Sequence, residues 1–191
     1  MTKVQKKIIV VDDNNANLTA CKNVMKPFYE VYPVPSVKKM FELLEDVMPD
    51  LILLDADMPD VNGYEAAGRL KKDKAFEGIP IIFLSGRVDP KSEIFGLNMG
   101  ALDYIHKPFV SELLLKRIQT HLSLIEYRKI LEERNKSIEE ISAPLNGIIG
   151  VLNTALETDD PGKIKDCLNR AESASKDLLA LINDITTVPV K

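Results

Sequence analysis

The stretch KIIVVDD, residues 7–13, decides the fold class of this 191-residue chain. Four consecutive apolar residues lead directly into two carboxylates, those of Asp12 and Asp13. Comparable runs end in Asp55, Ser85 and Lys107. In an open parallel sheet the carboxyl ends of the strands line one crevice, and ligands bind there. The pattern therefore predicts that these polar side chains meet at one rim of a sheet.

The charges expected at this rim indicate what it binds. Three carboxylates would lie close together, with one hydroxyl and one ammonium group beside them. Like charges at short range repel, so such a cluster requires a cation among them. The sequence therefore predicts a site for a hard divalent metal ion and a phosphate-like group.

Apolar, strand-like runs alternate with helical stretches up to residue 108, a pattern typical of βαβ units and a parallel sheet. Five strands are expected, at residues 7–11, 30–34, 51–54, 80–84 and 101–106. The first, third and fourth runs are apolar throughout, as in central strands covered on both faces. The second run is mixed, contains Pro33 and is followed by Pro35, so we expect it at an edge of the sheet.

Taken in order, these motifs resemble the receiver domain of two-component response regulators over roughly residues 5–122. The matching residues are Asp12-Asp13, the stretch DADMP at 55–59 with Gly63 after it, Ser85-Gly86, Tyr104 and Lys107-Pro108. Each motif alone is weakly specific, but together, on five evenly spaced apolar runs, they are highly specific. The resemblance implies an α/β, flavodoxin-like (βα)5 fold with the strand order of that family.

The same resemblance implies a role for each acidic residue. Asp55 would be the nucleophile that accepts a phosphoryl group as an acyl phosphate. Mg²⁺ would be coordinated by Asp13, by Asp55 and by the backbone carbonyl of Asp57, while Asp12 would hold it through water. Self-phosphorylation and dephosphorylation would both depend on this ion.

The remaining site residues would stabilise the phosphoryl group and respond to it. By resemblance, Lys107 neutralises its charge, Ser85 donates a hydrogen bond to one of its oxygens, and Tyr104 turns inward behind Ser85. Asp57 and Arg87 occupy the positions that tune the lifetime of the acyl phosphate in this family. The alternative for these two residues is an ordinary solvated side chain.

No strand signal returns after residue 108. Helical periodicity predicts one long helix over residues 109–156 and a second over 161–186, separated by a break at residues 158–162. Pro144 lacks an N–H group, so a kink is expected there. We expect a receiver domain at residues 1–122 and a helical hairpin at residues 123–191.

Each helix of the hairpin carries apolar residues at heptad spacing. In the first helix they are Ile138, Ile141, Leu145, Ile148 and Leu152; in the second they are Ile164, Leu168, Ala171, Ser175, Leu178, Ile182 and Ile185. An isolated hairpin does not bury a continuous seam, whereas two copies bury it in a four-helix bundle. The spacing predicts a homodimer that forms through residues 123–187.

The hairpin carries a second resemblance. The stretches EEISAPLNGIIG at 139–150 and LLALINDI at 178–185 resemble the dimerisation and phosphotransfer domain of sensor histidine kinases. That family has a phosphoacceptor histidine five residues before the proline, where this chain has Glu139. A carboxylate does not form a phosphoramidate, and Ala143 replaces the threonine that supports phosphatase activity. The resemblance implies a pseudo-kinase bundle that keeps the shape and lacks the chemistry.

No other residue restores kinase chemistry. Both histidines of the chain, His106 and His121, lie in or beside the receiver-like part, and we interpret them as partly exposed polar residues. The nine glycines form neither a GxGxxG motif nor a P-loop. We therefore expect a protein that is not an enzyme.

Composition narrows the expected binding partners and the expected compartment of the protein. A net charge of −4 without a clustered basic face gives no reason to expect nucleic-acid binding. No apolar run approaches the roughly 18 residues that span a bilayer, and the polar start is not a signal peptide. Two isolated cysteines, Cys21 and Cys167, read as reduced core residues of a cytoplasmic protein.

These features predict a response regulator that controls a signalling partner through phosphorylation. Asp55 would take a phosphoryl group from a histidine kinase or phosphotransfer protein and alter the dimeric bundle, which contacts another receiver or kinase. Two alternatives remain open. The chain could be the N-terminal fragment of a receiver-containing hybrid histidine kinase whose ATP-binding domain follows residue 191. Alternatively, the bundle only dimerises the chain and the receiver acts as a phosphate sink.

Overall fold

The computed structural model describes residues 5–187, and it describes side chains as far as residue 183. Its contacts divide the chain into two compact units, with the boundary between Leu124 and Ile125. Each unit is therefore described by itself.

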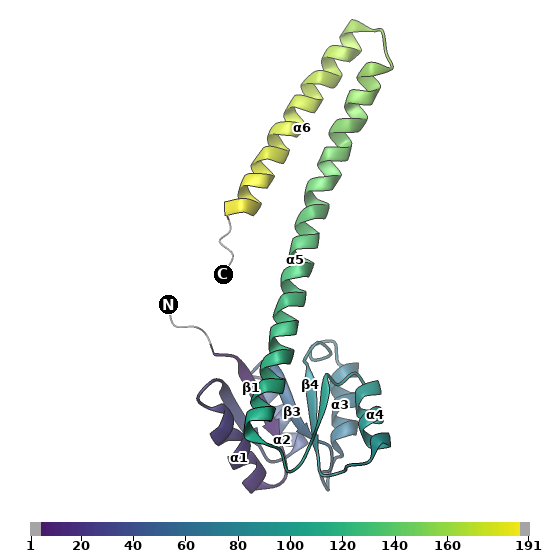
Figure 1. The fold of residues 1–191 in the computed structure, drawn as a ribbon. Helices are drawn as coiled ribbons and strands as arrows, with labels where there is room; N and C mark the ends of the chain where they lie inside the picture. The colour runs from purple at the N-terminus through teal and green to yellow at the C-terminus, as the bar shows by residue number, and fades with distance from the viewer. Residues whose placement is uncertain (1–4, 188–191) are drawn as a thin grey trace. The chain divides into compact units, whose positions relative to one another are not determined.

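The N-terminal unit alternates strands and helices along the chain (Figure 1). The elements are β1 Lys7–Val11, α1 Asn15–Met25, β2 Glu30–Val34, α2 Val37–Leu44, β3 Leu51–Asp55, α3 Gly63–Lys72, β4 Ile81–Ser85, α4 Pro90–Asn98 and β5 Asp103–His106, followed by the start of α5 Ser111–Leu156. The five strands form one parallel sheet in the order β2-β1-β3-β4-β5. The expected parallel sheet with a flavodoxin-like order is confirmed, with the proline-containing β2 at its edge.

Helices cover both faces of this sheet, which explains why the central strands are apolar throughout. On β3, Leu51 and Leu53 face one core cluster, while Ile52 and Leu54 face the other. The first cluster includes residues of α1 and α5: Leu18, Cys21, Met25, Leu114, Ile118 and Leu122. The second includes residues of α2 and α3: Val37, Met40, Leu44, Ala66, Ala67 and Leu70. Alternate residues of each strand are thus buried on opposite faces.

The register of the sheet brings the ends of its strands level with one another. The paired positions at this end are Val11 with Leu54, Asp55 with Leu84, and Ser85 with His106. Asp12 and Lys107, which follow β1 and β5 directly, therefore lie at the same edge as Asp55 and Ser85. This edge carries the polar residues that the sequence pattern predicted to meet.

The C-terminal unit is a helical hairpin. The later part of α5 runs to Leu156, and α6 Pro161–Thr187 turns back beside it (Figure 1). Asp160 caps α6 by accepting hydrogen bonds from the backbone N–H groups of Gly162 and Lys163 at 2.9 and 3.4 Å. The long helix is continuous through Pro144. Among residues 5–187, none of the helices has an apolar stretch long enough to cross a membrane.

The predicted seam of α5 does not form one buried stripe. Ile148 is buried and Ile141 is half-buried, but Ile138, Leu145 and Leu152 are 61%, 45% and 38% exposed. Six exposed apolar residues of the later part of α5 form what we call the outer stripe: Leu131, Ile138, Leu145, Ile149, Leu152 and Leu156. Ile125, Tyr127 and Ile130 of α5 are exposed as well. The hairpin of one chain covers only one side of a broad apolar face, and burial of the whole seam between two copies stays a prediction.

Helix α6 likewise has both buried and exposed apolar residues. Cys167 and Ala171 are buried within the hairpin, whereas Leu168 and Leu179 are exposed. The predicted seam residue Ile185 lies among the residues whose side chains the structure does not describe. Each helix of the hairpin thus has an inner apolar face and an exposed apolar flank.

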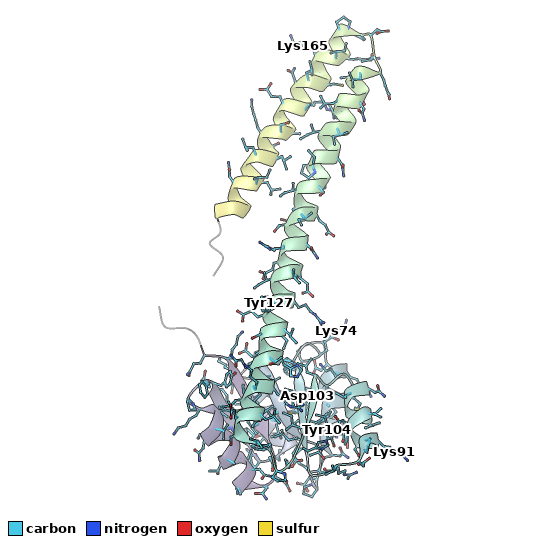
Figure 2. All side chains as sticks on the ribbon, in the orientation of Figure 1. Lys74, Lys91, Asp103, Tyr104, Tyr127 and Lys165 are labelled. Carbon is cyan, nitrogen blue, oxygen red and sulfur yellow. The ribbon has the colours of Figure 1, made fainter. Side chains whose placement is uncertain are left out.

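Asp103, at the start of β5, ties this strand to α5 (Figure 2). Its two carboxylate oxygens each accept a hydrogen bond from Arg117 at 2.9 Å, and His121 Nε2 lies 3.1 Å from Oδ2. Burial alone would raise the pKa of Asp103, but the hydrogen bonds from Arg117, the Tyr104 backbone and His121 together lower it. The carboxylate therefore stabilises the fold in its ionised form.

We expect Asp103→Asn to lower the free energy of unfolding by about 1 kcal/mol at pH 7, because the paired charge is lost. The folded-state pKa lies below the unfolded value of about 3.9, so this contribution is present above that pH and is lost as the pH falls through the folded pKa. Urea unfolding at pH 7, 4, 3 and 2 measures it, because the contribution is lost only below the unfolded pKa. Glu65→Gln, which removes an exposed pair with Arg69, is the control and should cost less than about 0.5 kcal/mol. A pH-independent difference for Asp103→Asn would contradict this account.

Candidate functional site

Three carboxylates gather at the carboxyl edge of the sheet. Asp12 and Asp55 are buried, Asp13 is exposed, and one oxygen of each lies within 4.8 Å of the others. Asp12 and Asp13 follow β1, and Asp55 is the last residue of β3. Carboxylate oxygens converging at this range are the ligands that Mg²⁺ prefers. The residue set fits a divalent cation with one face open to solvent.

Lys107 lies between the two buried carboxylates. Its Nζ is 2.6 Å from Asp12 Oδ2 and 2.7 Å from Asp55 Oδ2. Burial alone would lower the pKa of Lys107, but the hydrogen bonds to Asp12 and Asp55 together raise it. One ammonium offsets one of three negative charges, so the cluster remains negative and attracts a further cation.

The environment of Asp55 disfavours the charged form of its carboxylate relative to a carboxylate in water. Burial raises the pKa of Asp55, and this outweighs the opposing effects of Lys107 and of the Asp57 backbone N–H, which donates to Oδ1 at 3.0 Å. A desolvated carboxylate is a stronger nucleophile than a hydrated one, because less water must be displaced when it reacts. Asp55 is therefore suited to attack an electrophile delivered from the open side.

Asn17 supports the cluster from α1 and was not among the residues predicted from the sequence. Its Nδ2 donates to both oxygens of Asp12, at 3.0 and 3.1 Å, and the backbone N–H of Asn14 donates to Oδ1 at 2.9 Å. These donors fix the Asp12 carboxylate in one orientation. The only sequence signal for Asn17 was its place one turn into the helix that follows Asp12.

Asp57, Ser85 and Arg87 form a second polar group beside Asp55. The Ser85 hydroxyl donates to Asp57 Oδ2 at 2.8 Å and accepts from the Arg87 backbone N–H at 2.9 Å. Arg87 Nε lies 2.6 Å from Asp57 Oδ1. The hydroxyl of Ser85 is thus engaged by Asp57, and it must leave this bond to reach any group attached to Asp55.

Tyr104 is buried behind this group. Its side chain is 2% exposed, and its hydroxyl lies 3.1 Å from that of Tyr64, a contact that the sequence did not predict. Burial, followed by the hydrogen bond with Tyr104, raises the pKa of Tyr64. Gly96 lets α4 approach, because an added Cβ there would lie 3.0 Å from the Phe83 ring and 3.2 Å from the Tyr104 ring. The interior on this side of the sheet therefore connects the site to α4.

Neither histidine lies free on the surface of the N-terminal unit. His106 Nδ1 is 2.9 Å from the backbone oxygen of Arg87, and Nε2 is 3.4 Å from Glu93 on α4. His121 contacts Asp103. Glu139, at the position of the expected phosphoacceptor, is exposed on α5 in the C-terminal unit.

Comparison with known proteins identifies the family. Residues 8–119 match the family described as the response regulator receiver domain. The chain therefore belongs to the response regulator receiver family. Receiver domains are in general phosphoacceptors rather than enzymes; they bind Mg²⁺ at an acidic pocket, for which this chain has Asp12, Asp13 and Asp55, and they interact with histidine kinases or phosphotransfer proteins.

Individual relatives agree with this assignment. A protein named "Probable cyclic di-GMP phosphodiesterase", from Vibrio cholerae serotype O1, is 33% identical over 162 residues, 81% of this chain and 37% of the relative. Hybrid signal transduction histidine kinase D of Dictyostelium discoideum is 30% identical over 130 residues, 68% of this chain and 8% of the relative. The chain thus spans well under half the length of either protein.

A solved structure agrees as well. A CheY-like response regulator receiver domain protein from Methanospirillum hungatei JF-1 has 30% identity and a TM-score of 0.60, covering 65% of this chain and 98% of that chain. The similarity to the Vibrio cholerae protein, at 162 residues, is longer than the 112 residues (8 to 119) of the family match, so it extends beyond the receiver domain.

Proposed function

We propose that this chain is a response regulator in which Asp55 accepts a phosphoryl group from a histidine kinase or a phosphotransfer protein. The observation that supports this most directly is the position of Lys107, held between the buried carboxylates of Asp12 and Asp55 at the end of β3. A cation in this place neutralises charge on a phosphoryl group attached to Asp55.

The transfer is a displacement at phosphorus. An oxygen of Asp55 forms a bond to the phosphorus atom of the donor phosphohistidine while the bond between nitrogen and phosphorus breaks. The nitrogen leaves with the electron pair and takes up a proton. In the separate hydrolytic step a water oxygen bonds to phosphorus, the bond to Asp55 breaks, and the carboxylate and inorganic phosphate are released.

The neighbouring residues have separate roles in this step. Asp13, Asp55 and the backbone carbonyl of Asp57 would hold Mg²⁺, with Asp12 acting through water, and the ion would neutralise charge on the phosphoryl oxygens. Lys107 moves its ammonium toward the same oxygens. Ser85 exchanges its hydrogen bond to Asp57 for one to the phosphoryl group, and the backbone after β4 moves with it. Tyr104, which is already buried, would stay inward behind Ser85 as this segment moves.

Phosphoryl uptake tests the proposal. The full chain is incubated with acetyl phosphate in the presence of Mg²⁺, and its intact mass is measured over time. We expect a gain equal to one phosphoryl group that depends on Mg²⁺ and is reversed on standing. Absence of uptake, or uptake unaffected by a chelator, would contradict the proposal.

Asp57→Asn should speed phosphoryl uptake severalfold and shift the half-life of the acyl phosphate. The change removes a negative charge beside the incoming group and loses the ion pair with Arg87, while an amide oxygen still accepts from Ser85. Intact-mass time courses measure both rates. Asp60→Asn, an exposed carboxylate on the same loop, is the matched control. Unchanged rates in Asp57→Asn would show that Asp57 and Arg87 do not tune the site.

The second part of the proposal concerns the hairpin. We propose that it is a pseudo-kinase dimerisation domain, in which Glu139 replaces the phosphoacceptor histidine, and that two copies join through residues 123–187. Support comes from the exposed outer stripe of α5 and the exposed Leu168 and Leu179 of α6, since apolar surfaces of this kind normally face a partner. Phosphorylation of Asp55 would alter the geometry of this dimer and its contact with a kinase or another receiver.

Light scattering with and without Mg²⁺ and beryllofluoride, a mimic of the aspartyl phosphate, tests this part separately. We expect a dimer in both states. A chain that dimerises only with the mimic would assign dimer control to the receiver, and a monomer in both states would contradict the bundle.

A second candidate function is that of the receiver-containing segment of a hybrid histidine kinase. The relative from Dictyostelium discoideum favours it, since that protein is named as a hybrid kinase and is far longer than this chain. Reading the coding sequence past Lys191 discriminates between the two. A following ATP-binding domain would favour the kinase, although Glu139 would still lack the chemistry for self-phosphorylation.

A further inference from the structure

The outer stripe of α5 contains a regular heptad repeat, which suits pairing with another helix in a coiled coil. Leu131, Ile138, Leu145 and Leu152 are spaced by seven residues, and all four are exposed. Ile141 and Ile148 belong to the neighbouring face, which the hairpin covers. Exposure and the seven-residue spacing together select the four residues as d positions of a coiled-coil seam that is open in the single chain.

The corresponding a positions change character along the helix. They are Arg128, Asn135, Ser142, Ile149 and Leu156. Asn135 lies between Leu131 and Ile138, and its side chain forms no hydrogen bond within the described part of the chain. Three of these a positions, Arg128, Asn135 and Ser142, are polar. An asparagine at an a position pairs with its copy across a parallel two-stranded seam, and it specifies register at a cost in stability.

Charges at the flanking positions favour the same arrangement. With these a and d positions, Arg134 is a g residue and Glu139 is the e residue five positions later. In a parallel dimer, g of one helix meets this e of the other, so the two charges are complementary. Both side chains are exposed, and neither forms an ion pair within residues 5–183.

We propose that residues 128–142 of α5 pair with the same segment of a second copy in a parallel, in-register seam, in which Arg134 of one copy meets Glu139 of the other. The inference rests on the proposed homodimer and specifies its register. It also assigns a structural role to Glu139. The carboxylate at the former phosphoacceptor position stabilises the dimer instead of carrying a phosphoryl group.

Charge exchange tests the pairing. In the full chain, Arg134→Glu and Glu139→Arg each place like charges at both symmetry-related contacts, so each variant alone should dimerise about tenfold more weakly. Mixed in equal amounts, the two variants restore both opposite-charge contacts, and the affinity should return to within about twofold of wild type. Sedimentation equilibrium measures the constants, and circular dichroism checks that the helices are retained.

The outcomes separate this inference from the dimer itself. If the wild type dimerises but the single variants dimerise with unchanged affinity, the seam is overturned and the dimer itself is not. The same holds if the mixture of the two variants dimerises no more tightly than each variant alone. A monomeric wild type would overturn both.

Cysteine cross-linking gives an independent readout of register. Asn135→Cys should form an intermolecular disulfide with oxidised glutathione, since a positions face each other within disulfide reach. Lys136→Cys, one residue later and outside the seam, should not. Cross-linking at both positions or at neither would overturn the in-register arrangement.

Discussion

Asp55→Asn should reduce phosphoryl uptake by at least about a hundredfold, because an amide oxygen is not an effective nucleophile toward phosphorus. Asparagine has the shape of aspartate, and its oxygen still accepts the hydrogen bond from the Asp57 backbone N–H. Lys107 keeps its contact with Asp12 in the variant. The loss is therefore chemical, and the measurement is the intact mass of the chain after incubation with acetyl phosphate and Mg²⁺.

Two controls separate loss of the nucleophile from a general effect on surface charge or on assembly. Asp60→Asn changes an exposed carboxylate five residues away and should take up a phosphoryl group at the wild-type rate. Light scattering should show the same mass for Asp55→Asn as for wild type, since position 55 is remote in sequence from residues 123–187. Uptake that survives in Asp55→Asn would place the acceptor elsewhere, with Asp12, Asp13 and Asp57 as the nearest carboxylates.

Gly63→Ala is expected to lower the free energy of unfolding by about 3 kcal/mol or more. A Cβ at Gly63 would overlap the backbone oxygen of Asp55 and lie 2.9 Å from Ala56 Cα, closer than real side chains approach. These are backbone atoms, so no change of rotamer relieves the overlap. Either α3 must move away from the sheet, or the end of β3 must shift together with Asp55.

Urea unfolding of the full chain measures the cost, and phosphoryl uptake by the folded variant reports on the position of Asp55. Gly68→Ala is a matched control in the same helix, because the nearest heavy atom to its added Cβ is Met99 Cε at 3.6 Å. Helix propensity alone should make that variant more stable by up to about 1 kcal/mol. Equal effects of the two substitutions would show that the close approach at Gly63 does not exist.

The sheet and its polar edge could be predicted from local patterns. The runs that end in Asp12, Asp55 and Ser85 are short, apolar and regularly spaced, and parallel pairing brings their ends together whatever the details of packing. The strand limits were less certain, since Ser85 belongs to β4 and β5 begins only at Asp103. The first and last residues of a strand depend on which backbone groups form hydrogen bonds with the neighbouring strand, and the local sequence does not specify those bonds.

Contacts between distant residues could not be predicted in this way. Tyr64 and Tyr104 are 40 residues apart, and only the packing of α3 against the sheet brings their hydroxyls together. Asn17 reaches Asp12 because α1 starts at a particular angle after β1. The close approach at Gly63 has the same origin, since it depends on where α3 starts relative to β3.

The hairpin shows most clearly which features follow from the sequence and which follow from the tertiary structure. Its sequence by itself determined that α5 and α6 are helices with apolar residues at heptad spacing, because periodicity follows from the geometry of one chain. Spacing did not distinguish Ile148, which is buried, from Leu145 and Leu152, which are exposed. Only the tertiary structure decided this, because burial depends on which side of a helix another element covers, and that choice is made by the packing of the whole hairpin.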